Sequence, residues 1–194
     1  MKKRFAVVAL LVALLATSVR PARADDFALD ESHTSIIFGI SHMGLSYTYG
    51  RFNKMAGEFS LDAADPAKST FKLTIDATSI DTANAGRDKH LNSGDFLNTG
   101  EFPLITFEST KVATREVEGK TVYDITGNFT MHGVTKEITI PLTLLGQGAG
   151  PQGDQRAGFM CDTKLMRSAY GMDKMLPAIG DEVAITISFE GIKK

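Results

Sequence analysis

The chain has 194 residues, of which 21 are Lys or Arg and 23 are Asp or Glu. Five of the basic residues and none of the acidic ones lie within the first 24 residues, so the remainder has 16 basic against 23 acidic residues, a formal charge of −7. This acidic balance disfavours nucleic acid and anionic membrane surfaces as non-specific partners, because both attract positive charge.

The N-terminus has the three features of a secretory signal peptide. Lys2–Arg4 is positively charged, Phe5 to about Val19 is an uncharged apolar run, and Ala22-Arg23-Ala24 offers small residues at the cleavage positions. The apolar run is shorter than the ~20 residues that a membrane-spanning helix needs. We therefore expect residues 1–24 to be a cleaved signal peptide, residues 25–194 to form a single domain, and the product not to insert stably into a membrane.

Apolar and polar residues alternate with period two along five segments, which predicts strands with one apolar face. In chain order these segments are 36–40, 71–75, 123–131, 138–144 and 183–189, and weaker strand patterns run over 51–61, 104–112 and 157–165. The total is about eight strands, separated by turn residues at Asp65-Pro66, Glu118-Gly119 and 146–153. Pro141 cannot donate a hydrogen bond to a neighbouring strand, so it predicts a sheet edge or a bulge.

The segment Asp81–Phe102 breaks the alternation with charges, glycines and short helix-like turns. We expect a connection with one or two short helices there, with Ser93 as an N-cap. Eight antiparallel strands with one apolar face can close into a barrel or stack as two sheets, and the alternation does not choose between the two. A closed barrel of this size either packs its interior with side chains or holds one small ligand.

Residues that could carry chemistry are few. The four histidines, His33, His42, His90 and His132, have no metal-binding spacing, and no nucleophile turn or phosphate loop is present. A site that assembles these histidines from distant positions stays open, which gives a metal-binding or enzymatic barrel as the alternative function. The single cysteine, Cys161, cannot form an internal disulfide and is either buried and inert or an exposed thiol.

Five ordered motifs resemble the YceI-like family, and together they cover nearly all of the chain after the signal peptide. They are Asp30-x-x-His33-Thr-Ser-Ile-x-Phe38-x-Ile-x-His42; Arg87-Asp88-x-His90-Leu91 followed by Asp95-Phe96; Phe102-Pro103-x-Ile-Thr-Phe107-x-Ser109; Gly127-Asn-Phe129-Thr-Met-His132-Gly133-Val-Thr135; and Arg167-x-x-Tyr170-Gly171-Met172 followed by Gly180-Asp181-Glu182-Val183. One departure from the family pattern is Met160-Cys161, which we expect to change the lining of the cavity.

The resemblance implies an all-β fold, an antiparallel eight-stranded lipocalin-like barrel with a long apolar pore. It also implies a periplasmic, non-enzymatic protein that binds an isoprenoid lipid, either a polyisoprenoid or a quinone tail, for storage, transport or sensing. No metal and no cofactor other than such a bound lipid is expected, and homodimer formation stays open.

On this interpretation the inward residues of the strands line the pore and polar residues form its rim. The expected apolar lining is Ile36, Phe38, Ile40, Phe59, Leu73, Ile75, Ile105, Phe107, Phe129 and Met131. The expected polar rim is His42, Arg87, Asp88 and His90. Each apolar residue in this set could equally be part of a filled core, so the hollow interior rests on the resemblance alone.

Overall fold

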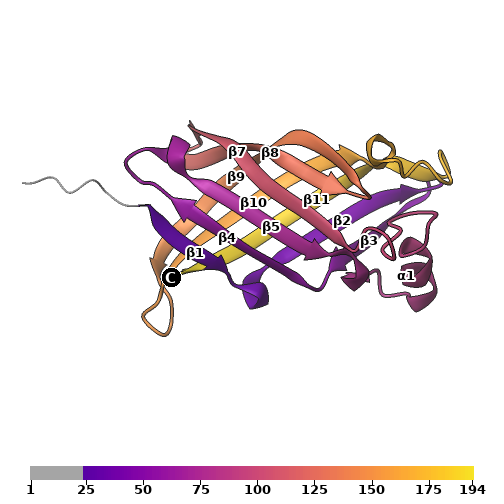
Figure 1. Ribbon diagram of the computed structural model, residues 1–194, viewed down its shortest axis with the longest axis horizontal. Helices are drawn as coiled ribbons and strands as arrows, with labels where there is room; N and C mark the ends of the chain where they lie inside the picture. The colour runs from indigo at the N-terminus through magenta and orange to yellow at the C-terminus, as the bar shows by residue number, and fades with distance from the viewer. Residues whose placement is uncertain (1–23) are drawn as a thin grey trace, which may run out of the picture.

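A computed structural model describes residues 24–194 (Figure 1). Residues 1–23 of the expected signal peptide therefore lie outside the described residues. The strands are β1 (Asp25–Leu29), β2 (Ser35–His42), β3 (Ser46–Phe52), β4 (Met55–Leu61), β5 (Thr70–Asp76), β6 (Ile80–Asp81), β7 (Leu104–Val117), β8 (Lys120–Met131), β9 (Val134–Ala149), β10 (Gln155–Met166) and β11 (Ile179–Lys193). The helices are α1 (Ala85–Leu91) and the short 3-10 turns η1 (Glu31–His33), η2 (Pro66–Lys68), η3 (Ala77–Ser79) and η4 (Arg167–Tyr170). None of the helices in the described part of the chain is long and apolar enough to cross a bilayer.

The eleven strands form one closed antiparallel barrel with eight positions around its wall, as the family resemblance implies. Three positions are each occupied by two successive strands. β1 and β2 are separated by η1 and both pair with β11, β3 is followed directly by β4, and β5 continues through η3 into β6. Closure comes from β1, which pairs with β4 on one side and with β11 on the other.

Two tight hairpins show how the sequence sets the strand register. Glu118 and Gly119 between β7 and β8 both have positive φ angles, and so do His132 and Gly133 between β8 and β9. Two-residue turns with positive φ match the right-handed twist of the flanking strands, and glycine at the second position favours them. The turn expected at Glu118-Gly119 is therefore confirmed.

Three local predictions differ from the structure. The segment 51–61 is not one strand, because β3 ends at Phe52 and β4 begins at Met55. The loop expected at 146–153 is shorter, because β9 continues to Ala149 in register with β10. Ser93 follows the only α-helix of the described chain instead of capping it: Asn84 is the N-cap, and its side chain accepts a hydrogen bond from the backbone N–H of Arg87 at 3.0 Å.

Pro141 lies where β9 is hydrogen-bonded on one side only. It is paired with Asp124 of β8, whereas the ladder between β9 and β10 runs from Ala149 and Gln155 only as far as Thr143 and Met160. A proline is tolerated at such a position because no neighbouring strand needs its missing N–H. The expectation of a sheet edge at Pro141 is confirmed.

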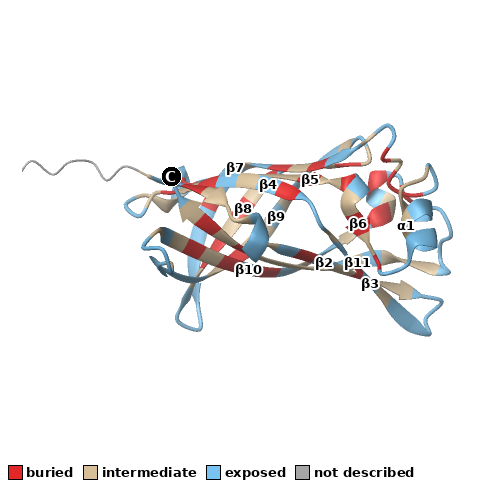
Figure 2. Cartoon of the chain, turned by 90° about the horizontal axis from the view of Figure 1, so that it is seen from below, coloured by how far each residue is buried: buried red, intermediate tan, exposed pale blue. Residues whose placement is uncertain are grey.

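The interior differs between the two ends of the barrel. The end of the barrel that holds β1 and the C-terminus lies opposite α1 (Figure 1), and burial along the strands is shown in Figure 2. At that end aromatic rings pack inside the barrel around Phe159, which has no exposed surface. The ring centroid of Phe159 lies 5.3–5.8 Å from four other rings, those of Phe59, Phe71, Tyr123 and Phe189. We call these five rings the aromatic plug. Gly191 makes room for it, because a Cβ there would come within 2.3 Å of the Phe59 ring.

We expect Phe159→Ala to destabilise the protein by about 3–5 kcal/mol, since it removes the ring that the other four rings contact and leaves a cavity that the barrel wall cannot collapse to fill. The adjacent side chain of Met160 points outward and is 37% exposed, so Met160→Ala is the matched control and should change stability by less than about 1 kcal/mol. Urea unfolding at equilibrium measures both. Equal stability losses for the two variants would contradict the assignment of Phe159 as the centre of the plug.

Candidate functional site

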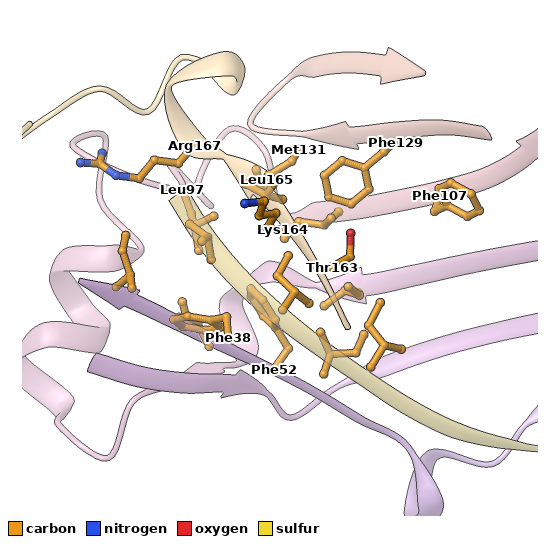
Figure 3. Close-up of a pocket in the computed structure, with 18 of the residues that line it drawn as sticks. Phe38, Phe52, Leu97, Phe107, Phe129, Met131, Thr163, Lys164, Leu165 and Arg167 are labelled. Carbon is orange, nitrogen blue, oxygen red and sulfur yellow. The ribbon is translucent and has the colours of Figure 1, made fainter. Parts of the chain in front are cut away.

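Between the aromatic plug and α1 the barrel is hollow. A cavity of about 630 Å³ occupies this half, within the range of pockets that hold small-molecule ligands. Its wall is overwhelmingly apolar and comes from nearly every strand position of the barrel together with the 82–103 connection. Figure 3 shows Phe38, Phe52 and Leu97 on one side of this space and Met131, Phe129 and Phe107 on the other.

All ten residues that the sequence predicted as apolar lining do lie on this cavity. They are Ile36, Phe38 and Ile40 of β2, Phe59 of β4, Leu73 and Ile75 of β5, Ile105 and Phe107 of β7, and Phe129 and Met131 of β8. Period-two alternation brings them together, because it directs one residue in two to the inside of every strand. Their contact with a ligand stays a prediction.

The sequence interpretation missed much of the opposite wall. β11 contributes Val183, Ile185 and Ile187, and β10 contributes Thr163 and Leu165. The alternation of β11 was visible in the sequence and could have placed its three residues on the lining. Thr163 lies on the same face of β10 as Leu165, but as a polar residue it gives no apolar signal in the alternation.

The plug forms the floor of the cavity and therefore limits its depth. Phe59, Phe71 and Phe189 all belong to both the plug and the cavity lining. From Val183 near the mouth to Phe189 at the floor, β11 covers about 20 Å, which is roughly 15 Å along the axis of a barrel with tilted strands. The pore expected from the family resemblance is thus a deep pocket with one closed end.

Two of the four predicted rim residues, Arg87 and Asp88, make hydrogen bonds that hold α1 in place at the mouth of the cavity. Arg87 donates hydrogen bonds to the Thr82 hydroxyl at 2.8 Å and to the Thr82 carbonyl at 2.7 Å, and an Asp88 carboxylate oxygen accepts from the Thr82 backbone N–H at 2.9 Å. These bonds fix α1 to the chain that leaves β6. Arg87 also lines the cavity, as do His42 and His90, whereas Asp88 is not among the lining residues.

Arg167 is a mouth residue that the sequence interpretation did not select. It is 3% exposed, and its guanidinium donates to the carbonyls of Met172, Ile179 and Gly180 at 2.5–3.0 Å. Burial lowers the pKa of Arg167 from its usual value. Because a buried charge is costly unless it is hydrogen-bonded, these three carbonyls hold Arg167 in place, and Arg167 in turn holds the loop that leads into β11. Figure 3 shows its side chain at the α1 end of the cavity.

The histidines are not brought together as the alternative function requires. Within residues 24–194, one group has three potential metal ligands within reach of each other, and of the histidines it contains only His33, with Asp30 and Glu190. The guanidinium of Arg156 donates to Asp30 at 2.7 Å and to Glu190 at 2.9 Å. Hydrogen bonds from Ser32, His33 and Arg156 hold the pKa of Asp30 well below its usual range. The Arg156 cation therefore supplies the positive charge that these carboxylates need.

His90 and His132 make hydrogen bonds with different partners. His90 is hydrogen-bonded to Asp95 at 3.0 Å, and a ring nitrogen of His132 lies 2.8 Å from the carbonyl oxygen of Tyr170. The His132 contact joins the turn between β8 and β9 to η4. It bridges β9 and β10 beyond the end of their hydrogen-bonded ladder.

Cys161 is buried within the hydrophobic core, and its burial raises the pKa of its thiol to about 11. The pair Met160-Cys161 was expected to change the cavity lining, but neither residue lines the cavity. Met160 points outward and Cys161 packs in the core cluster that contains the plug, so that expectation is wrong. By the period of two Cys161 is on the same face of β10 as Phe159 and Thr163, but it packs with the plug cluster while Thr163 lines the cavity.

Comparison with known proteins agrees with this architecture. Residues 27–191 match the model of the YceI-like domain. A UPF0312 protein of Pseudomonas paraeruginosa is 44% identical, and the match covers 100% of both chains. The crystal structure of BcnA from Burkholderia cenocepacia superposes with a TM-score of 0.74 at 23% identity, over 84% of this chain and 98% of that one. A polyisoprenoid binding domain from Saccharophagus degradans gives a TM-score of 0.68 at 16% identity, over 87% and 98%.

We expect the Cys161 thiol of the folded protein to react with a thiol reagent at pH 8 at least about 100-fold more slowly than in the unfolded chain. The raised pKa alone reduces the thiolate fraction by that factor, and burial adds to the effect. A matched control is the double variant Cys161→Ser, Met160→Cys, which moves the thiol to the outer face of the same strand and should react at nearly the unfolded rate. Fast reaction of the native thiol would contradict its place in the core.

Proposed function

The chain belongs to the YceI-like family, and from this premise we propose that it is a periplasmic binding protein that encloses the apolar chain of an isoprenoid lipid. The occupant is a polyisoprenoid or the tail of an isoprenoid quinone, held for storage, transport or sensing, and the protein catalyses no reaction. The structural neighbour from Saccharophagus degradans is described as a polyisoprenoid binding domain, which supports this choice of ligand.

The single observation that carries the proposal is the shape and chemistry of the cavity. It is deep, lined mostly by apolar residues and closed at one end by the aromatic plug. A narrow pocket of this kind fits a flexible hydrocarbon chain better than a compact polar metabolite, because apolar residues predominate in its lining. The charged residues beside its floor, Glu58 and Lys72, are exposed, and Glu58 is paired with Lys194 at 2.7 Å.

Burial of hydrocarbon provides enough free energy for useful affinity. Removing about ten methylene-sized groups from water is worth about 8 kcal/mol before the costs of association. The depth of roughly 15 Å accommodates only part of a long polyisoprenoid. A longer chain must fold back or extend through the mouth, and a headgroup would then lie among His42, Arg87 and His90 at the rim.

The signal-peptide pattern at residues 1–24 supports the proposed location. Export would place the barrel in an aqueous compartment bounded by membranes. An isoprenoid chain is poorly soluble there because its apolar surface is costly in water. A barrel that covers this surface allows the lipid to exist away from a bilayer.

We expect organic extraction of the purified protein, followed by mass spectrometry, to release a lipid with an isoprenoid chain. Added isoprenoid quinone should also raise the midpoint of thermal unfolding of delipidated protein, because a ligand that binds only the folded state stabilises it. Absence of lipid in the extract together with an unchanged unfolding midpoint would contradict the proposed function.

A filled cavity should abolish binding without unfolding the barrel. Ile185 points into the cavity from β11, and Ile185→Trp should reduce quinone uptake about tenfold or more because the larger ring occupies the ligand's volume. Ala184 immediately precedes Ile185 in β11 and is exposed, so Ala184→Trp adds the same ring outside the barrel and should bind normally. Fluorescence-monitored quinone titration compares them, and equal uptake by both variants would place the ligand elsewhere.

A further inference from the structure

A long uncharged segment includes the hairpin between β2 and β3. Residues 32–50 contain no Asp, Glu, Lys or Arg, the longest such run in the described part of the chain, although 23% of all residues are charged. The inward residues of β2 explain part of this run, because they line the cavity. The tip of the hairpin needs a different explanation, since Met43, Leu45, Tyr47 and Tyr49 are 60–83% exposed.

The two tyrosines point away from the cavity. Ser46 and Thr48 of β3 line the cavity, so the alternate residues Tyr47 and Tyr49 lie on the outer face. Their rings are stacked with centroids 6.4 Å apart. Tyr49 lies so close to Gly39 of β2 that a Cβ at residue 39 would come within 2.8 Å of the ring. The outer face of the hairpin is thus an ordered aromatic surface.

A second apolar loop lies beside the tip. The backbone N–H of Met43 donates to the carbonyl of Ala178 at 2.6 Å, which ties the hairpin to the loop before β11. That loop exposes Met175 and Leu176. We call Met43, Leu45, Tyr47, Tyr49, Met175 and Leu176 the mouth patch. It borders the cavity directly, because His42, Met175 and Ile179 belong to the lining (Figure 2 shows this exposed end, with β3 and α1).

The chemistry of the mouth patch matches the interface of a lipid bilayer. Tyrosine places an apolar ring and a polar hydroxyl at the boundary between hydrocarbon and water, and leucine and methionine enter the hydrocarbon. The patch carries no charge, and the chain after residue 24 is acidic, so a neutral surface suits it better than an anionic one. A second copy fits less well: a stable dimer buries about 800 Å² on each partner over complementary faces, whereas this patch is spread over two projecting loops.

We propose that the mouth patch docks the open end of the barrel on a neutral lipid bilayer, so that the isoprenoid chain moves between membrane and cavity without crossing water. This inference rests on the proposed function for its cargo. The docking itself is a separate property of the surface, and it can be measured on protein without any ligand.

The test is flotation of the protein with phosphatidylcholine vesicles, with Leu45→Ser compared with Leu145→Ser. Both leucines are exposed, at 83% and 52%, but Leu45 is in the mouth patch and Leu145 is in β9 at the plugged end. Wild type and Leu145→Ser should float with the vesicles, and Leu45→Ser should bind about tenfold more weakly because one inserted side chain is lost. Added salt should change wild-type binding little, since no charges are involved.

Uptake of isoprenoid quinone distinguishes docking from cargo binding. Leu45→Ser should take up quinone from ethanol solution as well as wild type does, but about tenfold more slowly from quinone-loaded phosphatidylcholine vesicles. Failure of wild type to load from ethanol would contradict the proposed function and leave the flotation result intact. Equal flotation and equal vesicle uptake by Leu45→Ser and Leu145→Ser would overturn docking. So would a wild-type dimer that Leu45→Ser converts to monomer in analytical ultracentrifugation, since a second copy would then cover the patch.

Discussion

The packing of Phe159 against four other rings is the interaction on which the rest of the structure depends. An eight-stranded barrel is only just wide enough for its own side chains to fill it. Five rings pack together in one half, and aliphatic residues such as Ile125 and Leu142 complete the same core cluster. In the other half many inward residues are aliphatic, such as Ile36, Ile75 and Ile185, and the same wall encloses an empty volume. The plug therefore stabilises the fold and closes one end of the cavity.

At the mouth of the cavity, polar residues hold the surrounding loops in place, and apolar residues remain available to contact a ligand. Arg167 holds the loop before β11 through three carbonyls, and Arg87 with Asp88 holds α1 through Thr82. Because these hydrogen bonds join residues of the protein to each other, the polar groups of Arg87, Asp88 and Arg167 need no partner in the cavity. The rim is thereby kept open without a filled core beneath it, which a flexible apolar chain requires for access.

The alternation of side chains predicted much of the wall but not the interior. Period two is a local property, so it identified the inward set on β2, β5, β7 and β8 from neighbouring residues alone. Whether those residues meet a ring or a space depends on residues far apart in the chain, such as Phe59, Tyr123 and Phe159, and on strand registers that a single sequence does not encode in any short segment. The same limit explains the misplaced cap at Ser93, because Asn84 caps α1 only once the chain leaves β6 in the right direction.

The most direct measurement is a crystal structure of the protein loaded with an isoprenoid quinone. The account predicts continuous electron density for the isoprenoid chain between Phe38 and Phe107, with the headgroup at the mouth near Arg87. The chain should end against the rings that form the floor, those of Phe59, Phe71 and Phe189. Density for the chain on the outside of the barrel, or a cavity occupied only by ordered water while the quinone remains bound elsewhere, would contradict it.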